Sequence, residues 1–208
     1  LYDFVRAAAN GENDAYAIRE MKRPRCVFID NDNSYLNGIA DGLNLVRYGL
    51  NAADKNLYVA ASDVKSEPML SFSWEAEGKA QHHVDSHLIG AYNITNMLAA
   101  IAVGTYFGVE ADKIDAALTG YAPSNNRSQF EQTADNRLIV DAYNANPTSM
   151  AAALNNFEAI NADHKMAIIG DMKELGSVSH DEHQRIVDQL SRMTLEEVWL
   201  VGSEFEHT

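Results

Sequence analysis

The feature that most constrains the fold is an alternation of strand-like and helix-like segments from residue 127 to the end of the 208-residue chain. The pattern predicts strands at residues 128–133, 137–141, 165–170 and 197–202, and helices at residues 147–160 and 180–193. Strands that alternate with helices imply an α/β fold with a mostly parallel sheet and right-handed crossovers. The last three strands end in Asp141, Gly170-Asp171 and Gly202-Ser203. We expect these ends to share one sheet edge, where ligands bind in such folds.

The part of the chain before residue 122 has a different character. Helices are predicted at residues 1–20, with a break at Asn10-Gly11, and at residues 35–48, 94–107 and 110–118. Strands are predicted at residues 25–29, 57–60, 69–74 and 80–84, the last three in an antiparallel or edge sheet. Gly49 and Gly108 are expected to end the helices before them. A polar, proline-containing loop at residues 121–126 follows, so we expect one domain at residues 1–121 and another at residues 122–208.

The composition excludes several classes of protein. A net charge of −14 argues against nucleic acid or an anionic membrane as the main partner. No apolar run approaches the length of a membrane span, and we expect no signal peptide at the start. A single cysteine, Cys26, excludes an internal disulfide framework and a cysteine-based zinc cluster. It lies in an apolar run, which favours a buried structural thiol and fits a reducing, cytoplasmic setting.

The most informative polar stretch is DAYNANPTSM at residues 141–150. Pro147 suits a first helical turn and Asn146 suits the N-cap before it. Asp141, Asn144 and Asn146 therefore lie where a strand meets the positive end of a helix, a position that favours anions. An ordinary capped turn explains the same residues equally well.

Three further groups of residues are candidates for a binding site. Asn93 and Asn96 lie one helical turn apart, and paired amides can recognise a purine edge, although helix capping by Asn93 is the favoured interpretation. Arg127 can reach a phosphate or ribose, with a surface arginine as the alternative. Asp171 and Lys173 follow a predicted strand in GDMKELG at residues 170–176.

The histidines and glycines add limits to these candidates. His180 and His183 are three residues apart at a helix start, where capping is favoured over metal binding. His82, His83 and His87 show no spacing typical of metal ligands. Neither G-x-x-x-x-G-K-[ST] nor G-x-G-x-x-G occurs in the sequence. The chain therefore lacks the usual phosphate-binding loop, and the residues alone predict a two-part α/β protein with a polar crevice.

Taken together, these segments resemble the Mur ligase family of ATP-dependent enzymes of peptidoglycan precursor synthesis. DAYNANPTSM and IGDMKELG (residues 169–176), with His183 downstream, look like two of its motifs. YNITN at residues 92–96 looks like its H-N-x-x-N element, Asn126-Arg127 like its interdomain arginine, and residues 1–6 like the stretch after its modified lysine. The likeness covers nearly the whole chain and is greatest to the members that use a dipeptide.

The resemblance implies a reaction and a set of site residues. ATP would phosphorylate the carboxylate of a UDP-N-acetylmuramoyl-tripeptide, and the amine of D-alanyl-D-alanine would attack the acyl phosphate, with Mg2+ screening the phosphates. By similarity, the ATP-binding residues are Asn93, Asn96, Arg127, Asp141 and Tyr143, and the substrate-binding residues are Asn144, Asn146 and Asp171. Asn93 and Asn96 would face adenine, and Arg127 and Asp141 would meet phosphate or ribose. Tyr143, Asn144 and Asn146 would lie near the nucleotide or the dipeptide.

The resemblance also implies a domain order and two departures from the family. Residues 1–121 would be the latter part of a central ATPase domain, and residues 122–208 a Rossmann-like C-terminal domain cut short at its end. Tyr92 stands where the family usually has histidine, so no metal ligand is assigned. The phosphate loop, the magnesium-binding glutamate, the carbamylated lysine and the UDP-sugar domain would precede Leu1. We therefore expect a fragment that is inactive alone and contains no certain catalytic residue, from an enzyme that is a monomer at full length.

Other classes of protein remain as alternatives. One is a sibling ligase that adds a single amino acid, or an enzyme similar to folylpolyglutamate synthase. Another is a non-catalytic nucleotide-binding or regulatory module. A simple dinucleotide-binding domain is disfavoured by the missing G-x-G-x-x-G sequence.

Overall fold

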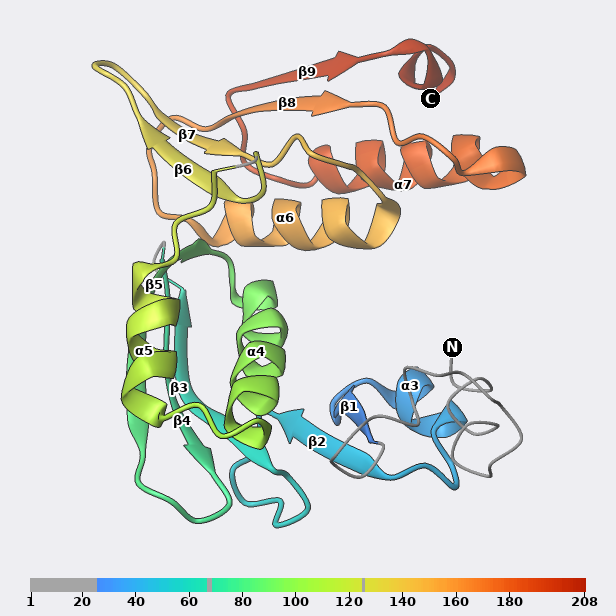
Figure 1. Cartoon of the computed structure of the whole chain (residues 1–208). Coiled ribbons are helices and arrows are strands. Elements are labelled where there is room, and N and C mark those ends of the chain that lie inside the picture. The colour runs from blue at the N-terminus through green and yellow to red at the C-terminus, as the bar shows by residue number, and fades with distance from the viewer. Residues whose placement is uncertain (1–25, 67–68, 125) are drawn as a thin grey trace. The chain divides into compact units, whose positions relative to one another are not determined.

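The computed structural model describes residues 26–66, 69–124 and 126–208 (Figure 1). The helices predicted within residues 1–20 lie outside the described residues. The chain divides into two compact units. The first unit consists of Leu1–Lys65, Leu70–Ser86 and Asn93–Tyr121, and the second of Ser66–Met69, His87–Tyr92 and Ala122–Thr208. The short segment His87–Tyr92 therefore belongs with the C-terminal part of the chain.

A five-stranded mixed sheet forms the centre of the first unit. Its strands are β1 (Val27–Asp30), β2 (Leu45–Gly49), β3 (Val59–Ser66), β4 (Met69–Ala76) and β5 (His82–Ile89), in that spatial order. β1 pairs with β2, and β2 with β3, in parallel. The links from β3 to β4 and from β4 to β5 are too short for a parallel crossover, so these neighbours are antiparallel. The expected antiparallel or edge sheet thus holds for β4 and β5, whereas β3 also pairs in parallel with β2, and both β3 and β5 run further than expected.

The helix predicted at residues 35–48 is wrong. Only a short helix, α3 (Ser34–Ile39), forms there, and its N-cap Asn33 accepts a hydrogen bond from the Leu36 N–H. The chain then turns at Gly42, where φ is +73°, and enters β2. Val46 and Tyr48 lie two positions apart, a spacing that places both side chains on one face of a strand, and both are buried in the sheet. Pairing with β1, which is a tertiary contact, decides between the two structures.

The predictions for Gly49 and Cys26 are also corrected by the structure. Gly49 lies inside β2 and does not end a helix. A Cβ atom there would lie 2.9 Å from Asp32 Oδ2, which gives the glycine a packing reason. Cys26 is half-buried and precedes β1, whereas a fully buried strand residue was predicted.

Two predicted helices of the first unit are confirmed. α4 (Ile94–Tyr106) follows a 3-10 turn, η1 (Ala91–Asn93), and α5 (Ala111–Gly120) follows α4 after Gly108, where φ is +83°. α4 packs on β1, β2 and α5. Its buried face consists of Ile94, Met97, Leu98, Ile101 and Ala102. Within the described residues, no helix is both long and apolar enough to cross a bilayer.

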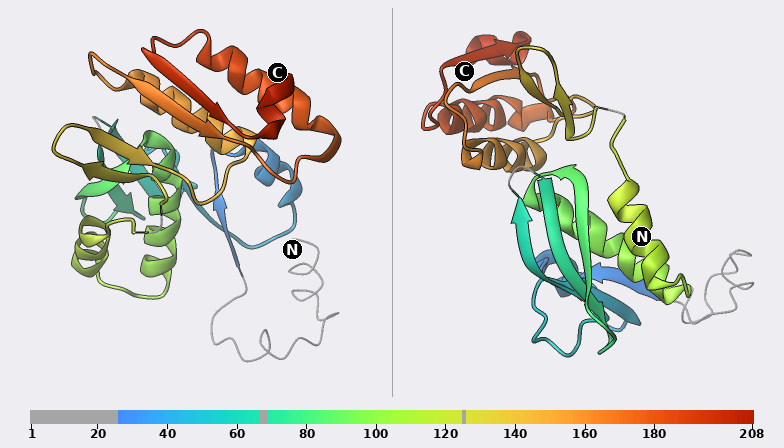
Figure 2. Two further views of the ribbon diagram at one scale, coloured as in Figure 1. Left: turned by 90° about the horizontal axis from the view of Figure 1, so that it is seen from above. Right: turned by 90° about the vertical axis from the view of Figure 1, so that its left-hand side faces the viewer.

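The second unit has the predicted order of elements and an α/β fold. These are β6 (Gln129–Gln132), β7 (Arg137–Val140), α6 (Pro147–Ala159), β8 (Met166–Gly170), η2 (Gly176–Val178), α7 (Ser179–Leu190), β9 (Glu197–Val201) and η3 (Ser203–His207). β8 and β9 pair in parallel, as expected. α6 and α7 pack side by side against them (Figure 2). Their shared core contains Leu154, Ala167, Ile169, Met172, Ile186, Leu190, Met193 and Phe205.

The described strands of this unit form two hydrogen-bonded pairs, of which β8-β9 is parallel, as expected for a mostly parallel sheet. β6 and β7 make a separate antiparallel pair with Gln129 opposite Val140. Because β7 pairs with β6 and not with β8, Asp141 does not share a hydrogen-bonded sheet edge with Asp171. Asp141 follows a strand of one hydrogen-bonded pair, and Asp171 follows a strand of the other.

Candidate functional site

Three of the predicted nucleotide-binding residues come together at the end of β7. The Cζ atom of Arg127 lies 3.7 Å from the centroid of the Tyr143 ring. Ser128 donates to Asp141 twice, from its backbone N–H to Oδ1 at 3.2 Å and from Oγ to Oδ2 at 3.5 Å. Tyr143 and Asp141 are exposed, so the arginine, the carboxylate and the ring together offer a charged, accessible surface. We call Arg127, Ser128, Asp141 and Tyr143 the arginine group.

The backbone on both sides of Arg127 holds this arrangement. Asn126 has a φ of +56° and Ser128 a φ of +48°, both in the left-handed region. Such a conformation costs a non-glycine residue about 1–2 kcal/mol. It is held by the Asn126 carbonyl, which accepts from the N–H groups of Ala142 at 2.8 Å and Tyr143 at 3.2 Å. Strained backbone that the surroundings over-determine is concentrated at functional sites.

Tyr92 belongs to the same surroundings. Its hydroxyl lies 2.6 Å from Ser128 Oγ. Its ring lies directly over Gly90, where φ is +92° and where a Cβ atom would be 2.3 Å from Tyr92 Cε1. The residue that departs from the family pattern is thus joined to the arginine group by a hydrogen bond. No local pattern in the sequence could have predicted this contact, because 36 positions separate the two residues.

Asn93 and Asn96 lie in the first unit and contact each other. The Asn96 amide donates from Nδ2 to Asn93 Oδ1 at 3.2 Å, as their one-turn spacing predicts. The predicted capping by Asn93 is wrong, since its side chain makes no capping hydrogen bond. The reason is η1, which continues the helical turn on the N-terminal side of Asn93. Asn93 is buried and Asn96 exposed, so the pair presents the Asn96 side chain to solvent.

Asn146 caps α6 as predicted. Its side-chain oxygen accepts from the Ser149 N–H at 2.9 Å, Ser149 Oγ accepts in return from the Asn146 N–H at 3.3 Å, and Pro147 occupies the first turn. Asn144 is exposed, and its side chain makes no hydrogen bond with any residue that the structure describes. Of the two amides, Asn144 is therefore the freer to meet a ligand.

Asp171 lies in a second, tightly packed group at the end of β8. Its side chain is 6% exposed. One oxygen accepts from Lys173 Nζ at 2.9 Å and the other from the Glu204 N–H at 3.2 Å. The carboxylate lies against the Cα of Gly202, where an added Cβ would be 2.1 Å from Asp171 Cγ. These contacts join the loop after β8 to the loop after β9.

His183 holds the same loop from its place on α7. It is fully buried, and its Nε2 accepts the Met172 N–H at 3.0 Å. Its Nδ1 lies 2.7 Å from the Ser179 carbonyl, to which it donates. Neither metal binding nor the favoured helix capping describes this histidine. Helix position alone could not reveal a partner in the loop before α7.

The electrostatics of Asp171 make a pH-dependent prediction. Burial acts to raise the pKa of its carboxyl, but the hydrogen bonds from Lys173 and Glu204 and the charge of Lys173 outweigh burial and hold this pKa below its usual value. The same hydrogen bond raises the pKa of Lys173. A lowered carboxyl pKa stabilises the fold above the unfolded-state value of about 3.9, and this stabilisation is lost as the pH falls through the folded-state pKa.

We therefore expect Asp171→Asn to lower the free energy of unfolding at pH 7, and the deficit to shrink below about pH 4. Urea unfolding at several pH values between 7 and 3 measures it. Asp163→Asn is the control, because the Asp163 side chain is exposed and has no hydrogen bond within the described residues. A deficit of equal size at pH 7 and pH 3 would contradict the assignment.

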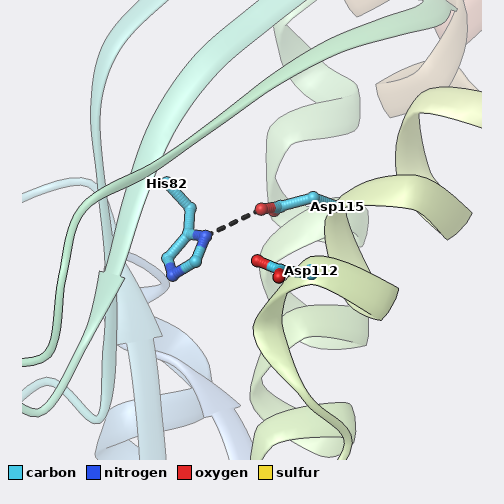
Figure 3. Close-up of side chains that lie close together, drawn as sticks. All are labelled: His82, Asp112 and Asp115. Atoms are coloured by element: carbon cyan, nitrogen blue, oxygen red, sulfur yellow. Dashed lines mark hydrogen bonds and ion pairs between the residues drawn. The ribbon is translucent and has the colours of Figure 1, made fainter.

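A third group, in the first unit, was not expected from the sequence (Figure 3). His82 at the start of β5 and Asp112 and Asp115 on α5 bring one potential ligand atom each within 4.8 Å of the others. His82 Nδ1 is 2.7 Å from one Asp115 oxygen, and Trp74 Nε1 donates to the other at 2.7 Å. The Trp74 ring also stacks on His82, with centroids 4.7 Å apart.

These contacts form a hydrogen-bonded group that ties α5 to β4 and β5. Both oxygens of Asp115 have hydrogen-bond partners from the sheet, so packing between α5 and the sheet accounts for the approach of His82 and Asp115, and no ligand is needed to explain it. The i, i+3 spacing of Asp112 and Asp115 was visible in the sequence, but their approach to His82 is a tertiary contact.

Comparison with known proteins covers both units. Residues 15–104 match the family described as Mur ligase middle domain, and residues 126–208 match Mur ligase, glutamate ligase domain. The UDP-N-acetylmuramoyl-tripeptide–D-alanyl-D-alanine ligase of Bacillus subtilis (strain 168) is 34% identical over 117 residues, which are 55% of this chain and 26% of that protein. The matched part of this chain thus covers about a quarter of the length of such relatives.

Solved structures give the same assignment. A crystal structure of MurF from Acinetobacter baumannii superposes with a TM-score of 0.76 at 25% identity, covering 91% of this chain and 41% of that one. MurF from Thermotoga maritima in complex with ADP superposes with a TM-score of 0.74 at 20% identity, covering 89% and 42%. With two domain matches in the family's order and the family's motifs placed within them, the chain belongs to the Mur ligase family.

Proposed function

We propose that the protein is an ATP-dependent ligase that joins D-alanyl-D-alanine to UDP-N-acetylmuramoyl-tripeptide. The observation that carries this proposal is the arginine group. Arg127 lies between two left-handed residues and against Tyr143, and its neighbour Ser128 binds Asp141, within the segment that matches the family. The names of the relatives supply the substrates. Because the matched part of the chain covers only about a quarter of those relatives, the activity belongs to the product of the complete reading frame.

Within that enzyme, residues 1–121 form the C-terminal part of the central ATP-binding domain and residues 122–208 belong to the C-terminal domain. Arg127 and Asp141 meet the phosphate or ribose of ATP, and Asn93 and Asn96 face its adenine. A guanidinium suits this task because its planar fork matches phosphate oxygens. The ADP bound to the Thermotoga maritima MurF supports a nucleotide as ligand. The enzyme acts as a cytoplasmic monomer.

The peptide substrates are assigned to the loop after β7 and to Asp171. The exposed Asn144 is the first candidate to contact the incoming dipeptide, with Asn146 holding the start of α6 beside it. Asp171 acts by keeping the loop after β8 in place, since both of its oxygens are bonded within the fold.

Magnesium does not fit at Tyr92. A neutral phenol is a poor magnesium ligand, and this hydroxyl is bonded to Ser128. No metal ligand is therefore assigned in this chain.

Phosphate release tests the function. The product of the complete reading frame receives ATP, Mg2+ and a muramoyl tripeptide, with D-alanyl-D-alanine or single amino acids as acceptor. We expect release that depends on the dipeptide. We expect none above a no-enzyme control from the 208-residue chain, since it lacks the glycine-rich phosphate loop. Release with a single amino acid alone would favour a sibling ligase, and no release with any acceptor would overturn the proposal.

A further inference from the structure

We propose that Tyr92 is a positioning residue for the nucleotide site: its hydroxyl orients Ser128, and Ser128 orients the carboxylate of Asp141. All three residues belong to the second unit. The proposal rests on the proposed function, because that function assigns Asp141 to ATP. It gives the tyrosine at position 92 a hydrogen-bonding task in the place where the family usually has histidine.

The direction of the hydrogen bonds follows from their chemistry. An ionised carboxylate only accepts, so Ser128 uses its single hydroxyl hydrogen toward Asp141 Oδ2, at 3.5 Å. At the 2.6 Å contact, Tyr92 must then be the donor and Ser128 Oγ the acceptor. The result is a directed chain from Tyr92 through Ser128 to Asp141. Because Tyr92 donates to Ser128 Oγ, the serine hydroxyl hydrogen is left for the Asp141 carboxylate.

Ser128 is built to transmit this orientation. It is 5% exposed, so solvent cannot readily replace either partner of its hydroxyl. Its backbone N–H donates to the other oxygen of Asp141, at 3.2 Å, so the serine grips the carboxylate at two points. Its left-handed backbone, at a φ of +48°, directs both donors to one side. Without Tyr92, the hydroxyl gains rotamers that do not point at Asp141.

An independent observation shows that the place of the Tyr92 ring is specified. A Cβ atom on residue 90 would lie 2.3 Å from Cε1 and 2.8 Å from Cδ1 of the ring, so only glycine allows this position. Gly90 also has a φ of +92°, in the region where glycine is favoured. Two features of one short segment, the missing side chain and the unusual turn, thus serve the placement of one hydroxyl.

The first test is Tyr92→Phe in the product of the complete reading frame. ATP affinity is measured by titration calorimetry, and KM values by phosphate release. We expect ATP affinity to fall and the KM for ATP to rise by about threefold to tenfold, the worth of one hydrogen bond. The KM for the muramoyl tripeptide stays unchanged. Tyr35→Phe is the control, because Tyr35 is 74% exposed and its hydroxyl has no hydrogen bond within the described residues.

A glycine pair gives a second test that leaves the hydroxyl in the protein. Gly90→Ala displaces the Tyr92 ring and should reproduce the ATP defect of Tyr92→Phe. Gly78→Ala is matched to it, because Gly78 also has a positive φ, +68°, but no atom within 4 Å of its added Cβ. It should leave ATP affinity unchanged while carrying a similar backbone strain.

A double-mutant cycle tests whether the effect passes through Ser128. Ser128→Ala already removes the hydrogen-bond link between Tyr92 and Asp141. Adding Tyr92→Phe to Ser128→Ala should therefore change ATP affinity by less than about twofold. Full additivity of the two substitutions would overturn the proposal.

Two outcomes separate this proposal from the proposed function. If the wild-type enzyme releases phosphate with the dipeptide and Tyr92→Phe binds ATP as well as wild type, the positioning role is overturned alone. The same holds if Tyr92→Phe raises the KM values of ATP and tripeptide equally while lowering the unfolding temperature, because that result describes a purely structural residue. A wild-type enzyme that shows no ligase activity overturns the proposed function, and the role of Tyr92 in it falls as well.

Discussion

Replacing Gly202 by alanine is expected to destabilise the second unit by about 2–6 kcal/mol, from two sources. The first is the backbone: Gly202 has a φ of +124° and a ψ of 161°, a region that is essentially restricted to glycine and costs other residues about 1–3 kcal/mol. The second is packing, because the new Cβ would lie 2.1 Å from Asp171 Cγ and 2.2 Å from Oδ2. Forcing atoms into such a filled site costs about 1–3 kcal/mol more.

Urea unfolding of the 208-residue chain measures this effect. Gly170→Ala is the matched control, since Gly170 ends the neighbouring strand with ordinary φ and no atom within 4 Å of an added Cβ. The double variant Gly202→Ala/Asp171→Ala removes the clash but keeps the strained backbone. We expect its loss in free energy of unfolding to be smaller than the sum of the losses caused by the two single substitutions. A Gly202→Ala protein as stable as Gly170→Ala would contradict the close approach of Asp171 to this turn.

Replacing Arg127 by alanine is expected to lower kcat/KM for ATP by about 10-fold to 150-fold in the product of the complete reading frame. This is the size expected when a charged hydrogen bond of about 1.5–3 kcal/mol is lost. Arg127 should be sensitive because its neighbours Asn126 and Ser128 fix its direction and the Tyr143 ring fixes its guanidinium. The Arg127 side chain is therefore held in place before a ligand binds, so it loses little conformational entropy on binding. Truncation to alanine then removes an interaction that contributes nearly its full free energy to binding.

Steady-state phosphate release at varied ATP measures this change. Arg127→Lys keeps the charge but loses the planar fork and the stacking on Tyr143, so it should recover only part of the activity. Arg137→Ala is the control for a lost positive charge, since the Arg137 side chain is exposed on β7 and has no hydrogen bond in the described part of the chain. Equal activities of Arg127→Ala and Arg137→Ala would show that Arg127 is an ordinary surface arginine.

Features that depend on neighbours along the chain could be predicted from the residues alone. The start of α6 is such a case, because Asn146 and Pro147 act within one helical turn of each other. The order of elements after residue 127 is another, since the alternation of apolar segments records which segments have a face to bury. The stop of α4 before Gly108 likewise needs only local backbone freedom. The family resemblance rested on such local motifs, and the domain matches agree with it.

Contacts between distant segments could not be predicted in this way and were seen first in the folded chain. Residues 45–49 became a strand because β1 was available to pair with them, although their own pattern also suited a helix. β7 paired with β6 in antiparallel fashion, so Asp141 and Asp171 follow strands of different hydrogen-bonded pairs. His82 contacts Asp115 although 33 positions separate them, and Tyr92 contacts Ser128 across 36 positions. The physical reason is that a local pattern states what a segment can bury or donate, whereas the choice of partner depends on the packing and loop closure of the whole unit.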